Sequence, residues 1–176
     1  MNDYQYNDSE SVLIITHPHE AYDHGHNREE IIDAVTNFDG YTCVIPYIGG
    51  IRGERIYGGS EIYDEVLFEG ELGGTLNERD AERLSIQYDE ILLGGGKATE
   101  CLRNTHLSLS KPAISEGVGL GIVPSITYDQ SWNRPEGFLL SEVIEVAQKK
   151  EDEEAEKLID KYLGQFNDGN TRLAHL

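Results

Sequence analysis

The sequence predicts a single-domain, three-layer α/β/α fold in which helices cover both faces of a mostly parallel sheet. Short apolar runs alternate with segments of helical periodicity along the chain, and this alternation is typical of parallel sheets with helical crossovers. The length of 176 residues is that of one ordinary domain. We expect the α/β domain to span residues 11–164, between a polar N-terminal tail (1–10) and a polar C-terminal tail (165–176).

Four segments are predicted to be the core strands: 11–16, 41–48, 89–93 and 118–127. The first is a continuous apolar run, which is typical of a strand buried on both faces. The second is rich in β-forming residues and is interrupted by Pro46 near its end. The third runs directly into three glycines.

Helices are predicted over residues 28–37, 78–86, 99–109 and 137–164. Asn27 and Asn77 stand where an N-cap side chain is favoured, and Pro112 is expected to stop the third helix. The fourth is amphipathic and heavily charged. The glycine-rich segment 49–74 is predicted to form a hairpin or flap on the rim of the sheet.

Ligands of parallel sheets bind at the carboxyl ends of the strands, and the glycine run 94–96 follows one such end. Cys101 would then lie in the first turn of a helix, where the helix dipole and Lys97 would lower its pKa and favour the thiolate. The expected substrate-binding residues are Gly94, Gly95, Gly96, Lys97 and Thr99. Alternatively, the glycines close a tight turn and Cys101 packs inward. Ala98 stands where a Walker A loop would need Ser or Thr.

The segment around Cys101 resembles the nucleophile segment of isochorismatase-like cysteine hydrolases. The resemblance covers residues 70–110 and rests on Glu100-Cys101-Leu102, on Thr105 four residues after the cysteine, and on Gly74-Thr75-Leu76-Asn77. It implies a Rossmann-like fold with Cys101 as nucleophile. The family also has an Asp at the end of its first strand and a Lys before the Gly-Thr element. Here no Asp occupies position 16 or 17, and no lysine precedes Lys97.

A histidine-rich segment follows the first predicted strand, so it lies at the same sheet edge. Its candidate metal ligands are His17, His19, Asp23, His24 and His26, which could hold zinc or another divalent ion. Alternatively, His17 is the general base for Cys101, or the segment is an ordinary solvated loop. Zinc or another divalent metal is the one cofactor that the sequence suggests.

The composition is strongly acidic, with 33 Asp and Glu against 14 Lys and Arg and a formal net charge of −19. Such self-repulsion is screened at molar salt, which predicts a halophilic, cytoplasmic protein. The charge argues against a nucleic-acid partner, and no apolar run is long enough for a membrane span. We expect a small-molecule ligand, and a homo-oligomer is possible. Cys43 and Cys101 are expected to be free thiols, Cys43 in the core.

These observations leave three functional hypotheses. The first is a hydrolase that uses Cys101 on a small amide or related carbonyl substrate. The second is a non-catalytic binding or assembly subunit of the same fold, for example in a haloarchaeal virus. The third is a Rossmann-like enzyme that binds a nucleotide or phosphoribosyl ligand at the glycine run.

Overall fold

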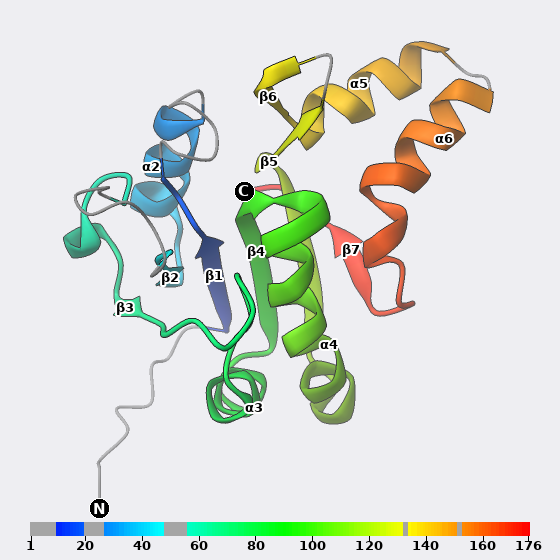
Figure 1. The fold of residues 1–176 in the computed structure, drawn as a ribbon. Coiled ribbons are helices and arrows are strands. Elements are labelled where there is room, and N and C mark those ends of the chain that lie inside the picture. Colours follow the sequence, from blue (N-terminus) through cyan, green and yellow to red (C-terminus); the bar gives the residue numbers. More distant parts are fainter. Residues whose placement is uncertain (1–9, 20–26, 48–55, 132–133, 151–152) are drawn as a thin grey trace, which may run out of the picture.

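The computed structural model describes residues 10–19, 27–47, 56–131, 134–150 and 153–176 (Figure 1). The sheet has the strand order β3-β2-β1-β4-β5-β6, and β7 also pairs with β5. The strands are β1 (Ser11–Thr16), β2 (Tyr41–Ile45), β3 (Glu65–Val66), β4 (Glu90–Lys97), β5 (Gly119–Ser131), β6 (Arg134–Leu139) and β7 (Thr171–Leu173). All pairs are parallel except β5 with β6.

Five α-helices are described: α2 (Arg28–Asn37), α3 (Glu78–Gln87), α4 (Arg103–Glu116), α5 (Leu140–Lys150) and α6 (Glu153–Tyr162). Three short helical turns accompany them: η1 (Ser60–Ile62), the π-helical η2 (Ala98–Leu102) and η3 (Gly164–Phe166). In the part of the chain that is described, no helix has the length and apolarity of a membrane span.

Alternate side chains of β1 enter two separate cores, as the pleat of a strand requires. Leu13 and Ile15 pack in the core that holds Ile31 and Val35 of α2. Val12 and Ile14 pack in the core beneath α3 and α4 and, further along, α5 and α6. Figure 1 shows α3 and α4 together on one side of the sheet and α2 away from them. The predicted three-layer α/β/α arrangement is confirmed.

The strand order places a topological switch point between β1 and β4. From β1 the chain passes to β2 and β3 on one side, then returns through α3 to β4 on the other side. Connections that leave adjacent strands in opposite directions open a crevice at their carboxyl ends, where ligands bind in such sheets. The residues at this crevice are those that follow Thr16 and Lys97, at the ends of β1 and β4.

The C-terminal third differs from the sequence prediction. Residues 137–164, expected to be one helix, contain the end of β6 followed by α5 and α6. The expected polar tail 165–176 contains η3 and β7, and Ala174 is buried, with its N–H donating to Ile122 O at 2.8 Å. β7 is a short edge strand with largely exposed side chains, so its sequence is polar although its backbone belongs to the sheet.

Two further elements extend beyond their predicted ends. β4 continues through the glycine run to Lys97, so these glycines belong to a strand and not to a loop. Helix α4 continues past Pro112, and it ends instead at Gly117, which adopts a left-handed conformation (φ +74°) suited to a helix C-terminus. The expected flap is represented by η1 and by β3, which pairs parallel with β2; residues 48–55 lie outside the described residues.

Candidate active site

His17 follows β1 in a conformation that is rare for a side-chain-bearing residue. Among the described residues it is the one non-glycine residue with a positive φ (+47°), and its surface is fully buried. Its backbone N–H donates to Ile45 O at 2.8 Å, and its carbonyl oxygen accepts from the Tyr128 hydroxyl at 3.0 Å. Strained conformations of this kind persist where the surroundings fix them, and they are concentrated at functional sites.

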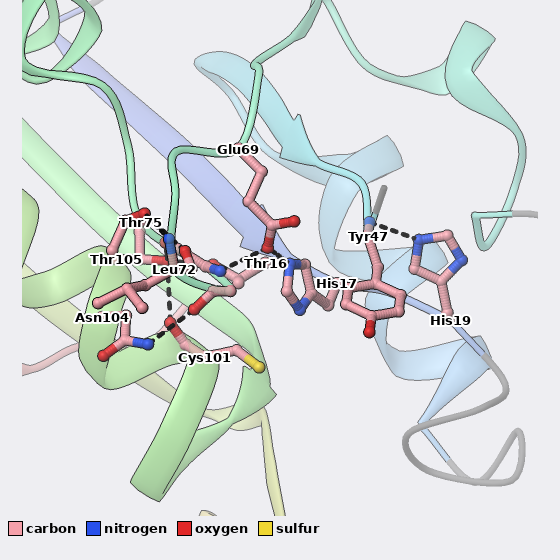
Figure 2. A network of polar contacts seen from close by, with 12 residues as sticks. Thr16, His17, His19, Tyr47, Glu69, Leu72, Thr75, Cys101, Asn104 and Thr105 are labelled. Atoms are coloured by element: carbon pink, nitrogen blue, oxygen red, sulfur yellow. Dashed lines mark hydrogen bonds and ion pairs between the residues drawn. The ribbon is translucent and has the colours of Figure 1, made fainter. Parts of the chain in front are cut away.

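The imidazole of His17 is paired with a carboxylate. Nε2 lies 2.5 Å from Glu69 Oε1, and the same oxygen accepts from the Gly74 N–H at 2.5 Å. The Glu69 side chain is only 8% exposed, and the Tyr47 ring packs edge-on against His17 with ring centroids 5.2 Å apart. Figure 2 shows His17 between Glu69 and Tyr47. The charge of Glu69 therefore acts on His17 with little screening by water.

The loop from Glu69 to Leu76 is fixed to the segment that carries Cys101. The amide of Asn104 donates to Gly73 O at 2.7 Å, and the Leu76 N–H donates to the Ser108 hydroxyl at 3.2 Å. Gly74 has φ +82°, and a Cβ atom there would lie 2.2 Å from the carbonyl oxygen of Cys101. Only glycine permits this backbone approach. The loop thus joins Glu69 to the cysteine turn.

Cys101 lies in η2, directly after β4, and it is 8% exposed. Burial raises the pKa of its thiol to about 11; the charges of Glu100 and Glu69 add to this effect, and a backbone hydrogen bond from Lys97 opposes it. The expectation of a thiolate with a lowered pKa was therefore wrong. Desolvation of the sulfur raises the pKa of the thiol by more than the polar groups of the turn lower it.

His17 also has a shifted pKa. Burial lowers the pKa of its imidazole below the usual 6.5, although the neighbouring Glu69 carboxylate opposes this shift through its charge and hydrogen bond. A neutral ring that donates its Nε2 proton to Glu69 carries its lone pair on Nδ1. The ring is then in the tautomer of a general base.

The predicted substrate-binding residues have structural partners within the chain. A Cβ atom on Gly95 would lie 2.4 Å from Thr16 O, and one on Gly96 would lie 3.0 Å from the Leu102 N–H nitrogen. These glycines therefore allow close packing of β4 on β1 and η2, and they form no open phosphate loop. Gly94 is likewise buried, against Ile126 and Ile15.

Lys97 and Thr99, the two polar residues among the predicted substrate-binding residues, also have partners within the chain. Thr99 donates to buried Asp129 through its backbone N–H at 2.8 Å and its hydroxyl at 2.7 Å, both to Oδ2. The Lys97 ammonium lies 3.7 Å from the exposed Glu100 carboxylate. Asp129 thus fixes the start of the turn that carries Cys101.

The histidine-rich segment is only partly described. His17 binds Glu69, and His19 Nε2 accepts from the Tyr47 N–H at 3.1 Å. Within the described ranges, no group of three His, Cys, Asp or Glu residues is placed to hold a metal ion. The metal site predicted from His17, His19, Asp23, His24 and His26 stays a prediction. Asp23, His24 and His26 lie outside the described residues.

A cleft of about 640 Å³ borders this network at the ends of β1 and β2. Tyr47 and His19 line it together with Arg28, Ile56, Gly58 and Glu61, among others. Because the Tyr47 ring also contacts His17, the cleft lies next to the polar network. It offers space for a small molecule at the sheet edge where ligands were expected.

The sequence pointed to Cys101 and His17 as candidates but not to Glu69, which the structure pairs with His17. Its place in the sequence could have indicated Glu69, because it stands five residues before Gly74, in the region where the resemblance places a lysine. A search for lysine alone passes over an acidic residue there. Asp129 and Tyr128 gave no local signal, because their roles depend on contacts with distant segments.

The fold is similar to that of isochorismatase-like hydrolases of known structure. One from Alkaliphilus metalliredigens has a TM-score of 0.52 at 12% identity, covering 95% of this chain and 95% of its own. The nicotinamidase from Staphylococcus aureus has a TM-score of 0.52 at 11% identity (73% and 90% covered). The MAR1 ribonuclease from Caenorhabditis elegans has a TM-score of 0.50 at 15% identity (87% and 91% covered).

At these identities the similarity shows the fold alone. No family model matches the sequence, and no curated protein is similar to it at a significant level. The isochorismatase-like fold that the resemblance around Cys101 implies is confirmed by the solved structures.

Proposed function

We propose that this chain is a cysteine hydrolase of small amides or related carbonyl compounds, with Cys101 as nucleophile and His17 as general base. One observation carries the proposal: two consecutive glycines lie between these residues. A Cβ atom on Gly73 would lie 3.9 Å from His17 Cε1, and one on Gly74 would lie 2.8 Å from Cys101 Cα. The His17 ring and the Cys101 backbone therefore border the same short stretch of backbone.

The raised pKa of Cys101 makes a base necessary. A thiol whose pKa is raised to about 11 is protonated near neutral pH, so its proton must leave before or during attack. The neutral imidazole of His17 accepts that proton on Nδ1. The sulfur then attacks the carbonyl carbon, and His17 returns the proton to the leaving amine. In the second half of the reaction His17 takes a proton from water, which attacks the thioester; the Cys101 sulfur leaves, regains the proton from His17, and the carboxylic acid is released.

The developing oxyanion needs hydrogen-bond donors near the sulfur. We assign this role to backbone N–H groups of the turn between Gly96 and Cys101 other than that of Thr99, which already donates to Asp129; this turn enters η2 after β4. Asp129 holds Thr99 in that turn, which would keep its donors in place during the reaction.

A second candidate, a non-catalytic binding subunit of the same fold, is favoured by one observation. Cys101 is 8% exposed and has a raised pKa, which are properties of a packing residue. In that case the cleft beside Tyr47 would bind a small molecule without turnover.

The test is hydrolysis of a panel of small amides and esters that begins with nicotinamide, because one structural neighbour is a nicotinamidase. We expect turnover of at least one compound, which Cys101→Ala abolishes. Cys43→Ala is the matched control, since Cys43 is fully buried in β2 and has no role in the proposed reaction. Turnover that survives in Cys101→Ala would contradict the nucleophile. Binding without turnover across the panel would support the second candidate.

A further inference from the structure

We propose that Glu69 is a positioning residue of this site and that His17 and Glu69 form a charge-inverted counterpart of the Asp and Lys expected from the resemblance. The inference rests on the proposed function for its catalytic meaning, but its geometry is independent of any substrate. His17 stands at the end of β1, where the Asp is absent. Glu69 stands before the Gly-Thr element, where the Lys is absent.

The two substitutions compensate each other. An acid at the first position is replaced by a residue that can be cationic, and a cation at the second is replaced by an acid. The two residues form a pair in this chain, since His17 Nε2 and Glu69 Oε1 lie 2.5 Å apart. An isolated change at either position would leave a buried group without its opposite charge.

Glu69 is itself fixed more firmly than a surface acid. Its Oε1 accepts the Gly74 N–H, and its backbone forms a bridge with Leu76. The loop is in turn bound to α4 through Asn104 and Ser108. The carboxylate is therefore held in one position, from which it fixes the ring orientation and tautomer of His17.

Glu69 acts on Cys101 in two ways of opposite sign. Directly, its negative charge opposes a thiolate. Indirectly, it stabilises the imidazolium that forms when His17 takes the thiol proton. In that step the S–H bond of Cys101 breaks, the proton passes to Nδ1, and the Nε2 proton stays between His17 and Glu69. The products are a thiolate and an imidazolium that lies between two negative groups. If Glu69 is a positioning residue, the indirect effect is the larger one.

The experiment measures alkylation of Cys101 by iodoacetamide at one fixed, near-neutral pH, with the labelled cysteine identified by peptide mass. This reaction needs no substrate: the sulfur displaces iodide and the proton goes to His17. We expect Glu69→Gln to slow labelling by about tenfold, the size of a one-unit change in effective pKa. An unchanged or faster rate would overturn the inference, because the direct effect would then dominate.

Two backgrounds make the result specific. Glu71→Gln changes an exposed carboxylate of the same loop, and its rate should equal that of the wild type. In a His17→Asn background, Glu69→Gln should no longer slow labelling. Without the imidazole, the one remaining effect of Glu69 is its repulsion of the Cys101 thiolate, and the substitution removes that repulsion. Slowing of the same size in both backgrounds would mean that Glu69 acts through the loop structure and not through His17.

Glu69→Asp covers the case in which Glu69→Gln does not fold, as judged by its thermal unfolding. The shorter carboxylate keeps the charge but retracts it from His17, so we expect a rate below that of the wild type. A rate equal to or above the wild type would overturn the inference. Failure of the amide panel with slowed labelling in Glu69→Gln would refute the hydrolase and leave the positioning role intact.

Discussion

The hydroxyl of Thr105 donates to the carbonyl oxygen of Gly74 at 2.6 Å, across 31 residues of sequence. The same hydroxyl oxygen lies 2.9 Å from the Thr16 hydroxyl and 3.3 Å from Cys101 O. Because its hydrogen is directed to Gly74, Thr16 is the donor in the Thr16–Thr105 bond. One buried side chain therefore links the end of β1, the Glu69 loop and the cysteine turn.

Thr105→Val should remove these bonds while keeping the shape of the side chain. We expect a loss of about 1–3 kcal/mol in the free energy of unfolding, because buried acceptors lose their donor, and slower alkylation of Cys101. Thr105→Ser keeps the hydroxyl and should retain most of both. Denaturant unfolding of the two variants separates the hydroxyl from the methyl group; equal losses would assign the effect to packing.

Gly74→Ala should destabilise the protein more than Gly117→Ala does. Both glycines have a positive φ, +82° and +74°, so both variants have a similar backbone strain. A Cβ at Gly74 collides with the Cys101 backbone, whereas one at Gly117 has no atom within 4 Å. We expect a loss of about 1 kcal/mol for Gly117→Ala and at least about 3 kcal/mol for Gly74→Ala. Similar losses in thermal or denaturant unfolding would contradict the close approach.

Stability should fall as the pH drops below about 6.5. Burial lowers the pKa of His106, opposed by Asp168, and lowers that of His17, opposed by Glu69. The unfolded chain then binds more protons than the folded one just below 6.5, so the free energy of unfolding increases with pH in this window. The slope is at most about 1.4 kcal/mol per pH unit for each histidine. His106→Asn should reduce the slope between about pH 7 and 5.5; an unchanged slope would exclude His106 as a contributor.

The thermal midpoint should rise with salt. The net charge of −19 opposes a compact state, and screening shortens the range of this repulsion from about 10 Å at 0.1 M salt to about 3 Å at 1 M. A midpoint that is flat or falls between roughly 0.1 and 2 M would remove the halophilic interpretation. Calorimetry or circular dichroism measures it directly.

Cys101 should react with alkylating agents before Cys43, although both react slowly near neutral pH. Burial raises the pKa of Cys101 to about 11 and raises that of Cys43 well above its usual value. Cys43 is fully buried in β2, whereas Cys101 retains some exposure. Peptide mapping after timed labelling gives the order. Simultaneous labelling of both thiols would mean that reaction requires global unfolding.

Local patterns were sufficient to predict most of the fold. Ser11–Thr16 and Arg28–Asn37 were predicted at their observed bounds, because an apolar run and an amphipathic period are properties of neighbouring residues; the Asn27 side chain expected to cap α2 makes no capping hydrogen bond. The strand β7 was not predicted, because its pairing with β5 depends on a partner about 50 residues earlier. Pro112 misled the prediction of the end of α4, since packing of α4 against the sheet outweighs one missing hydrogen bond.

The site was predictable in its parts but not in its electrostatics. The position of Cys101 after a strand was readable from the sequence, but the depth at which the fold buries its sulfur was not. Burial is a tertiary property, and it reverses the expected direction of the pKa shift. The partner of His17 was missed for a similar reason: Glu69 is one of 33 acidic residues, and only its contact distinguishes it from the others.

Strand β5 holds both halves of the site through adjacent residues. Tyr128 anchors the carbonyl of His17, and Asp129 anchors Thr99 at the start of the cysteine turn. Adjacent side chains of a strand leave it on opposite faces, and both anchors depend on the register that β5 takes after its last shift against β4, where Tyr128 pairs with Lys97. A slip by one residue would exchange their faces and release base and nucleophile together. The alignment of one strand therefore sets the positions of both His17 and the turn that carries Cys101, so a change in that alignment would displace both.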